Sequence, residues 1–220
     1  NMRIGYFADG PWSHNALDKI YKDKTLEVVF ICARFDTEDN VLRAKSASYG
    51  IPFVVHENIN SEEFLKFLSR ARCDIFVSMS FNQIFKKEVI NLPANKTINC
   101  HAGKLPFYRG RNVLNWALIN DEKDFGVTVH YVDDSIDTGD IILQRVYPIS
   151  DFDTYASLLD RSYSYCGDVL FDALKLIQAG EVRRIRQECI HPVGFYCPRR
   201  IIGDERLDWN LTSREIFNFV

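Results

Sequence analysis

Residues 98–111 read INCHAGKLPFYRGR, and this stretch decides how the rest of the chain is arranged. It places Asn99 and His101 two positions apart at the end of an apolar run. Because residues i and i+2 of a strand point to the same side, an amide donor and an imidazole would face one small space. There the amide can hold an oxyanion while the imidazole handles a proton.

A third chemical group comes from the later stretch VDDSIDTGDII, residues 132–142. Its Asp137 supplies a carboxylate that could orient the imidazole of His101 or take the proton itself. Asn, His and Asp in loops are more often turn and cap residues than catalysts. The three residues therefore need support from the motifs around them.

Longer ordered motifs surround all three residues. They read N-x-H-x-G-x-L-P-x-Y-R-G over 99–110, N-x-x-N-W-A over 112–117 and H-x-x-D-x-x-I-D-T-G-D-I-I over 130–142. Together they resemble the formyltransferase family that uses 10-formyltetrahydrofolate, which includes methionyl-tRNA, glycinamide ribonucleotide and nucleotide-sugar formyltransferases. The resemblance covers most of the chain, from about Met2 onward. The segment RGRNVLNWA looks most like the branch that formylates amino sugars on nucleotide carriers.

The resemblance implies that 10-formyltetrahydrofolate is the formyl donor and that the three motif residues surround its formyl carbonyl. It also implies that the segment after the fourth strand borders the pterin ring. Flat apolar walls with backbone hydrogen bonds suit a pterin, although the same phenylalanines would also serve as core. The predicted folate contacts are Phe81, Ile84, Phe85, Asp134 and Gly139.

The first strand, loop and helix are expected to form the acceptor side of the site. Free backbone N–H groups at a helix start bind anions, and we expect Ser13 to cap a helix over residues 14–21. The loop lacks G-x-G-x-x-G, so no nicotinamide cofactor is indicated. A guanidinium from Arg109 or Arg111 suits a phosphate or a carboxylate, or else caps a loop. The predicted substrate contacts are Asp9, Gly10, Trp12, Ser13, Tyr108 and Arg109.

The expected acceptor is a nucleotide-linked amino sugar. The resemblance favours a dTDP-linked dideoxy amino hexose, such as dTDP-4-amino-4,6-dideoxyglucose, used for surface polysaccharide (O-antigen) biosynthesis. The methionyl-tRNA branch needs a basic surface and a longer chain, and the glycinamide ribonucleotide branch lacks the L-D-W joint of residues 207–209. Both remain alternatives, as does a non-catalytic nucleotide-sugar or folate binder. A metal-dependent hydrolase is disfavoured by ligand spacing, and we expect no metal.

Apolar runs alternate with helical patterns along the chain, which predicts an α/β Rossmann-like doubly wound, mostly parallel sheet whose last strands are antiparallel. Strands are expected over 2–7, 26–33, 52–55, 73–79, up to 98, 125–132 and 141–148, with a long helix over 154–179. Ligands in such sheets bind at the carboxyl ends of the strands. We expect a formyltransferase catalytic domain over 1–190 and a C-terminal linker or extension over 191–220 that continues further.

Composition narrows the function classes. The 220 residues are 46% hydrophobic with a net charge of −3, which argues against a nucleic-acid binder. No apolar run is long enough for a membrane span, and the N-terminus lacks the apolar core of a signal peptide, so we expect a cytoplasmic protein. Six cysteines without a C-x-x-C pair are expected to be reduced. A homodimer is compatible with the apolar C-terminal segment.

Overall fold

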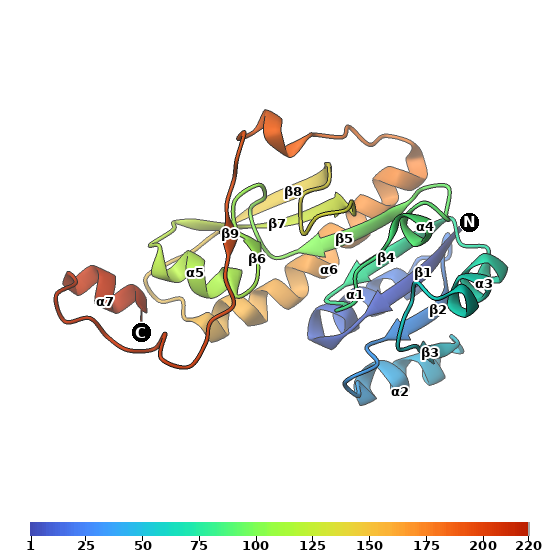
Figure 1. Ribbon diagram of the computed structural model, residues 1–220, viewed down its shortest axis with the longest axis horizontal. Coiled ribbons are helices and arrows are strands. Elements are labelled where there is room, and N and C mark those ends of the chain that lie inside the picture. Colours follow the sequence, from blue (N-terminus) through green and yellow to red (C-terminus); the bar gives the residue numbers. More distant parts are fainter. Residues whose placement is uncertain (220) are drawn as a thin grey trace.

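Seven strands form the main sheet in the computed structural model, which describes residues 1–219 (Figure 1). They are β1 (Met2–Ala8), β2 (Leu26–Ala33), β3 (Phe53–Val55), β4 (Ile75–Met79), β5 (Thr97–His101), β7 (Asp124–Tyr131) and β8 (Ile141–Pro148). Their order is β3-β2-β1-β4-β5-β7-β8, with the first five parallel and the last two antiparallel to their neighbours. The predicted mostly parallel α/β sheet with antiparallel last strands is confirmed. Val220, at the end of the expected extension, lies outside the described residues.

Strand β1 is buried on both faces, as expected of a central parallel strand. Ile4 and Tyr6 point into one hydrophobic cluster and Phe7 into the other. Gly5 lies between them because a Cβ there would come within 2.6 Å of the Phe30 ring. The short sequence MRIGYF thus supplies side chains to both hydrophobic clusters, and its glycine leaves room for the phenylalanine rings of one of them.

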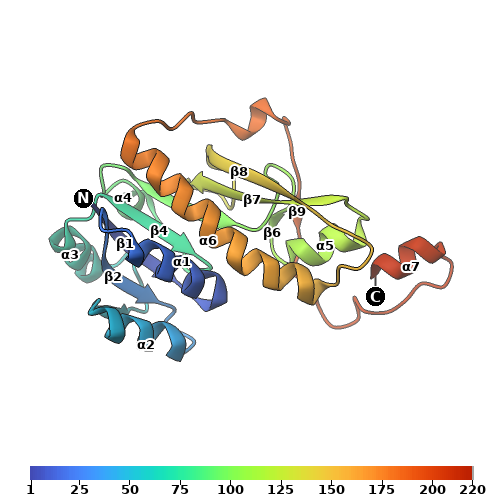
Figure 2. The ribbon, with the colours of Figure 1, turned by 180° about the vertical axis from the view of Figure 1, so that it is seen from behind.

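Helices cover both faces of the sheet (Figure 2). They are α1 (Gly10–Lys22), α2 (Asn40–Tyr49), α3 (Glu62–Ala71), α4 (Lys87–Ile90), α5 (Val113–Ile119) and α6 (Tyr155–Ala179). Helices α1, α2 and α6 pack on the mostly aliphatic cluster that contains Ile4 and Tyr6. Helices α3 and α4 pack on the phenylalanine-rich cluster that contains Phe7. The two layers hold the strands rigidly, so the loops at the strand ends have fixed starting points.

The start of α1 corrects the prediction made for Ser13. The helix begins at Gly10, with Pro11 in its first turn, where a missing N–H costs nothing. Ser13 is fully buried inside the helix, and its hydroxyl donates to the carbonyl of Gly10 at 2.7 Å. The predicted cap at Ser13 and helix start at residue 14 are therefore wrong. The other predicted elements lie at their expected places with small shifts at their ends.

Helix α6, 25 residues long, begins with a capping box formed by Thr154 and Ser157 and ends at Gly180, which has φ +69°. Its apolar stripe faces the sheet and α1, with Gly167 against the backbone of Ala16. Among the helices that the structure describes, none combines the length and the apolar character needed to cross a membrane.

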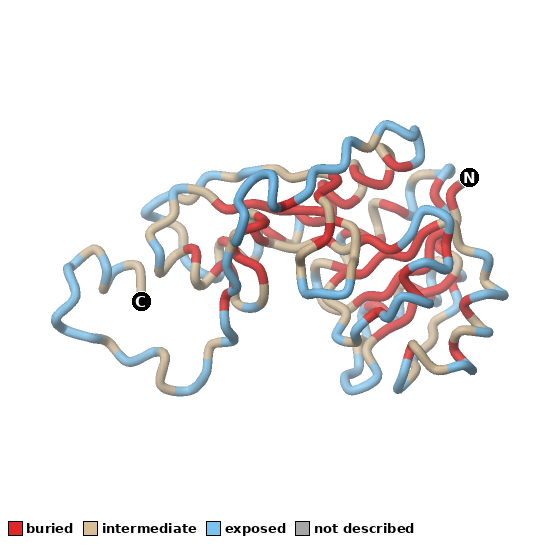
Figure 3. Tube along the Cα trace, turned by 45° about the horizontal axis from the view of Figure 1, so that its top comes forward, coloured by how far each residue is buried: buried red, intermediate tan, exposed pale blue. Residues whose placement is uncertain are grey.

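After α6 the chain returns along the free edge of the sheet as a segment that we call the strap, residues 181–197 (Figure 1). Ile185 exchanges two backbone hydrogen bonds with Ile141 of β8, and a 3₁₀ turn follows at Gln187–Cys189. Strand β9 (Tyr196–Cys197) then pairs in parallel with β6 (Arg109–Gly110). Most of the strap is exposed, with isolated buried positions (Figure 3), and a further helix, α7 (Ser213–Phe219), ends the described chain.

The phenylalanine-rich cluster provides a test of this packing. Phe7 is fully buried and its ring contacts those of Phe30, Phe76, Phe81 and Phe85. We expect Phe7→Ala to lower the free energy of unfolding by about 3–5 kcal/mol, because it removes buried surface and leaves a cavity. The measurement is urea unfolding monitored by circular dichroism.

The matched control is Phe152→Ala, which removes a ring that is 94% exposed and should change the free energy of unfolding by less than about 0.5 kcal/mol. Equal effects of the two substitutions would contradict the core described above.

Candidate active site

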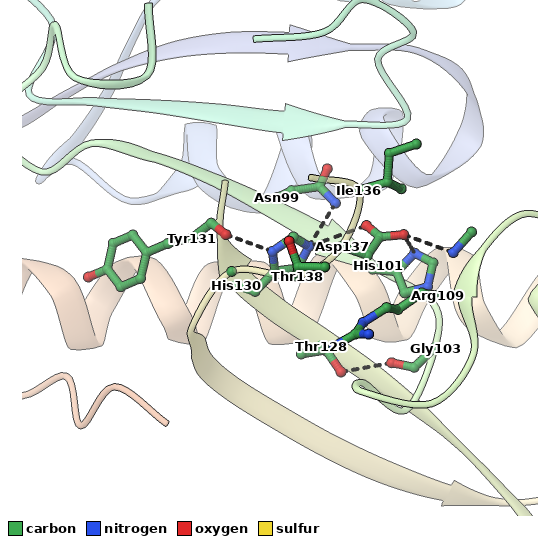
Figure 4. Close-up of polar contacts among 12 residues, drawn as sticks. Asn99, His101, Gly103, Arg109, Thr128, His130, Tyr131, Ile136, Asp137 and Thr138 are labelled. Atoms are coloured by element: carbon green, nitrogen blue, oxygen red, sulfur yellow. Dashed lines mark hydrogen bonds and ion pairs between the residues drawn. The ribbon is translucent and has the colours of Figure 1, made fainter. Parts of the chain in front are cut away.

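Three polar side chains, two from the carboxyl end of β5 and one from β7, lie together in the sheet. Asn99 and His101 point the same way, as their spacing predicts. The antiparallel pairing of β5 with β7 places His130 directly opposite Asn99. The Asn99 amide nitrogen lies 3.2 Å from His130 Nε2 (Figure 4). The sheet itself therefore assembles an amide and two imidazoles.

Asp137 enters this group from the loop between β7 and β8. One carboxylate oxygen lies 3.5 Å from His130 Nε2 and the other lies 3.6 Å from His101 Nδ1 (Figure 4). The N–H of Gly110 donates to the second oxygen at 3.0 Å. The backbone of Asp137 has φ +57°, a left-handed conformation that Asp tolerates better than most residues. The predicted meeting of Asn99, His101 and Asp137 is what the structure shows.

Two main-chain carbonyls fix the outer nitrogens of the imidazoles. His101 Nε2 lies 2.6 Å from the carbonyl oxygen of Tyr108, and His130 Nδ1 lies 2.8 Å from that of Tyr131. A carbonyl oxygen can only accept, so each of these nitrogens carries a hydrogen. The inner nitrogens, His101 Nδ1 and His130 Nε2, are left facing Asp137. Each inner nitrogen can therefore take up a proton beside a carboxylate.

The electrostatics of Asp137 favour its ionised form. Burial alone would raise the pKa of Asp137, but the electrostatic interaction with the neighbouring His101 ring, the interactions with His130 and the hydrogen bond from the Gly110 N–H outweigh that effect. Together they hold the pKa of Asp137 well below its usual range. The site thus contains a buried carboxylate that stays charged between two groups able to carry a proton.

Asn99, His101 and Asp137 line a cavity of about 650 Å³ at the carboxyl ends of the strands. Its walls come from the first turn of α1, the loops after β2 and β4, the end of β5 and residues 110–114. This is the edge of the sheet at which the fold predicts ligand binding. A volume of this size is typical of small-molecule sites. A hollow of about 780 Å³ between α5 and α7 contains none of the three residues.

The residues predicted to contact the folate do not lie together in the structure. Phe81 lines the cavity, whereas Phe85 is buried against Phe7 and Ile84 is 75% exposed away from the cavity. Asp134 is exposed on the loop and does not line the cavity. Gly139 is buried, and a Cβ there would lie 1.7 Å from the carbonyl oxygen of Tyr131, so its role is to let the loop pass close to β7.

The predicted acceptor contacts near α1 also separate. Trp12 lines the cavity and its indole N–H donates to Ser162 at 3.0 Å. Asp9 and Gly10 border a shallower hollow beside Arg34. Ser13 is enclosed in the helix, so its side chain does not reach either space.

Tyr108 and Arg109 correct the prediction for the turn after β5. The Tyr108 hydroxyl donates to Glu122 at 2.7 Å, and its ring is 7% exposed. The Arg109 guanidinium is buried and bonded to Gln187 and to the carbonyl of Val193. Neither side chain lines the cavity of Asn99, because the turn that carries them folds back toward the strap. The structure therefore places both side chains away from the cavity of Asn99.

Three residues that the sequence reasoning underrated occupy the site. Arg111 lines the cavity, is exposed, and has no carboxylate partner within residues 1–219. Arg34 also lines it, with its Nε 2.9 Å from the carbonyl of Ser80. His130, the first residue of the H-x-x-D motif, was given no role from the sequence. The signal that finds it is the antiparallel register, which puts position 130 opposite 99.

Two thiols, Cys100 and Cys166, also line the cavity, and both residues are buried. In the described part of the chain, no three His, Cys, Asp or Glu side chains are arranged to hold a metal ion. All six cysteines are free thiols, as expected, and four of them are buried.

Comparison with known proteins agrees with this geometry. Residues 2–174 match the family described as formyl transferase. The methionyl-tRNA formyltransferase of Fusobacterium nucleatum is 33% identical over 229 residues, a match that covers all of this chain and 72% of that protein. Two solved structures share the fold. One is WlaRD, a sugar 3N-formyl transferase solved in the presence of dTDP and 5-N-formyl-THF, with a TM-score of 0.76 and 22% identity over 99% of this chain and 77% of that chain. The other is an N-formyltransferase from Helicobacter canadensis in complex with folinic acid and dTDP-3-aminofucose, with a TM-score of 0.76 and 22% identity over 100% of this chain and 79% of that chain.

The charge on Asp137 gives a test of the site that needs no ligand. A carboxyl whose pKa is lowered by folding contributes stability that is present above its unfolded pKa and is lost as the pH falls. We expect wild type to be more stable than Asp137→Asn at pH 6. The difference in the free energy of unfolding should shrink by about 1 kcal/mol between pH 5 and pH 3, as the unfolded carboxyl takes up its proton.

Urea unfolding of both proteins across this pH range provides the measurement, with Asp134→Asn, an exposed carboxylate of the same loop, as the matched control. A difference that grows on acidification would contradict the lowered pKa of Asp137.

Proposed function

The chain belongs to the formyl transferase family, and from this premise we propose that it transfers a formyl group from 10-formyltetrahydrofolate to the amino group of a nucleotide-linked amino sugar. The observation that carries this proposal is the convergence of the Asn99 amide and the His101–Asp137 pair on one cavity at the carboxyl ends of the strands. An amide donor, an imidazole and a charged carboxylate are the groups that an acyl transfer to an amine requires.

The donor side is supported by the size and walls of the cavity. Its volume of about 650 Å³ and the flat ring of Phe81 beside the end of β4 suit a pterin. Both structural neighbours described above contain a formylated folate or folinic acid. We therefore assign the space between the β4 loop and Asn99 to the folate, with its formyl group directed at Asn99. The proposed catalytic unit comprises residues 1–190, with residues 191–220 as the extension.

The side chains divide the chemistry between them. Formyl transfer adds the acyl group to the amine, removes one proton from that amine and returns one to the folate nitrogen that departs. In this proposal the Asn99 amide, which lines the cavity, donates to the carbonyl oxygen as that oxygen gains negative charge. His101 cannot supply a second donor through Nε2, because that nitrogen donates to Tyr108.

In this proposal the inner nitrogen of His101, beside the charged Asp137 carboxylate, receives the proton that the amine loses, directly or through water. His130 provides a second imidazole on the other side of the same carboxylate. Because Asp137 remains ionised, a proton taken up by either ring is stabilised by a neighbouring negative charge. The imidazole can then keep the proton until the departing folate nitrogen takes it up.

The acceptor side is supported by charge. Arg111 lies at the cavity without a carboxylate partner in the described chain, and a guanidinium in that position suits a diphosphate. The net charge of −3 favours a small anionic acceptor over a large nucleic acid. Within this class we propose a dTDP-linked dideoxy amino hexose, such as the precursor of a surface polysaccharide. The ligands named for the two structural neighbours, dTDP and dTDP-3-aminofucose, support the choice.

Methionyl-tRNA is the second candidate acceptor, favoured by one observation. The Fusobacterium nucleatum protein, 33% identical over this whole chain, is a methionyl-tRNA formyltransferase. The two candidates differ in the charge that they require around the cavity, and an acceptor assay separates them.

We expect the protein to release tetrahydrofolate from 10-formyltetrahydrofolate only when dTDP-4-amino-4,6-dideoxyglucose or a related amino sugar nucleotide is present. Mass spectrometry should show one added formyl group on the sugar. The N-acetylated sugar nucleotide, which has the same nucleotide but no free amine, is the matched control. Turnover with methionyl-tRNA and none with sugars would establish the second candidate. Folate binding without turnover on any acceptor would indicate a binding protein.

We expect Asn99→Ala to lower kcat about a hundred- to a thousandfold, since it removes a donor to the developing oxyanion. The KM for the folate should change little, because the donor acts mainly in the transition state. Steady-state kinetics of tetrahydrofolate release provides the measurement, with Asn91→Ala, an exposed asparagine after α4, as the control. A folded Asn99→Ala protein with wild-type kcat would remove Asn99 from the mechanism.

A further inference from the structure

A buried glutamine on the strap holds the loop that carries Asp137. Gln187 is 1% exposed, although the strap around it is mostly exposed. Its side-chain NH₂ donates to the carbonyl oxygens of Asp137 and Gly139, at 2.8 and 2.7 Å. One side chain thus grips the loop on both sides of Thr138. The two carbonyls that it satisfies belong to the residue that supplies the carboxylate and to the glycine that allows the loop to approach β7.

Arg109 holds Gln187 from the other end. Its Nε and Nη2 donate to Gln187 Oε1 at 3.1 and 2.8 Å, and its Nη1 donates to the carbonyl of Val193 at 3.1 Å. Guanidinium nitrogens only donate, so the oxygen of Gln187 must face Arg109 and its nitrogen must face the loop. The orientation of the amide is therefore fixed by chemistry.

The loop is otherwise held by two hydrogen bonds to the Asp133 carboxylate, from the Ser135 N–H and the Thr138 hydroxyl, and by the Tyr196 hydroxyl, which donates to the carbonyl of Ile136. Asp134, Ser135 and Ile136 are exposed. Asp137 itself has a left-handed backbone conformation. Its carboxylate lies between two imidazoles, although burial disfavours its charged form. A loop with an unfavourable backbone conformation and little packing needs outside support to keep a side chain aimed.

We propose that Arg109 and Gln187 are positioning residues that aim the Asp137 carboxylate between His101 and His130. Neither lines the cavity, and both act through the backbone of the loop. Gln187 lies beyond residues 2–174, the part that matches the formyl transferase family, so the strap after α6 completes the site. This inference rests on the proposed formyl transfer, because that is the reaction for which Asp137 is aimed.

The sharpest substitution is Gln187→Glu. It keeps the length of the side chain and an oxygen for Arg109, and it replaces the NH₂ donor with an oxygen that faces two carbonyls. We expect kcat for formyl transfer to fall about a hundredfold, the loss typical of a catalytic group displaced by about 1 Å, with KM values changed by less than about threefold.

The pH profile distinguishes positioning from general destabilisation. With the loop released, Asp137 and the two imidazoles no longer stabilise each other's charges, so the acid limb of kcat should move from its wild-type position. Arg109→Lys keeps the charge but lacks the fork that holds Gln187, and it should shift the limb in the same direction by a smaller amount. An unchanged acid limb in both folded variants would overturn the proposal.

Hydrogen–deuterium exchange provides a readout that does not depend on activity. We expect Gln187→Glu to speed amide exchange in residues 133–139 at least tenfold while β5 and β7 remain protected. The matched control is Glu188→Gln, an exposed neighbour whose carboxylate forms an ion pair with Arg186, at 3.4 Å. It should leave the exchange, kcat and the pH profile unchanged. Equal exchange in the two variants would show that Gln187 does not hold the loop.

The two levels of inference fail in different ways. If wild type transfers no formyl group to any acceptor, the proposed function is wrong, and faster loop exchange in Gln187→Glu would still establish the grip on the loop. If wild type is active and Gln187→Glu matches its kcat, pH profile and exchange, the positioning role alone is wrong.

Discussion

The antiparallel pairing of β5 with β7 is the constraint on which the rest of the site depends. The parallel strands before it bring their carboxyl ends to one edge of the sheet, and β5 ends there with Asn99 and His101. Because β7 runs antiparallel to β5, His130 near its end lies beside Asn99. The loop that follows β7 then brings Asp137 back to His130 and His101. The antiparallel direction of β7 therefore brings His130 and Asp137 next to Asn99 and His101, although helix α5 lies between the two strands in the sequence.

The sequence predicted the parts of this arrangement that depend on local repeats. Alternating apolar runs and helical patterns predicted the sheet, and the period of two predicted that Asn99 and His101 share a face. His130 was underrated because its partner is set by register between strands that are far apart in the sequence. Arg109 was misplaced for a similar reason: its direction is set by the strap, whose Gln187 lies 78 positions later. Phe81 and Phe85 look alike in the sequence, and only the packing around Phe7 separates the wall of the cavity from the core.

The strap has two structural tasks that meet at one point. Ile185 bonds to the free edge of β8, where an exposed strand would otherwise be open to pairing with another chain. Two residues further on, Gln187 turns inward to the loop of Asp137. Protection of the edge and support of the loop are therefore coupled, because the hydrogen bonds of Ile185 fix the position along β8 from which Gln187 reaches the loop. A shift of the strap along β8 would disturb the carboxylate as well as the edge.

The carbonyl oxygens that bind the outer nitrogens of His101 and His130 have a consequence for how the site can change over time. These acceptors belong to the peptide backbone at positions 108 and 131, so any residue at either position would still present one. The tautomer of each imidazole is thus inherited from the path of the chain and is insulated from replacement of the side chains there. The residues that contact the amine substrate can therefore diversify by mutation, while each imidazole keeps the same tautomer.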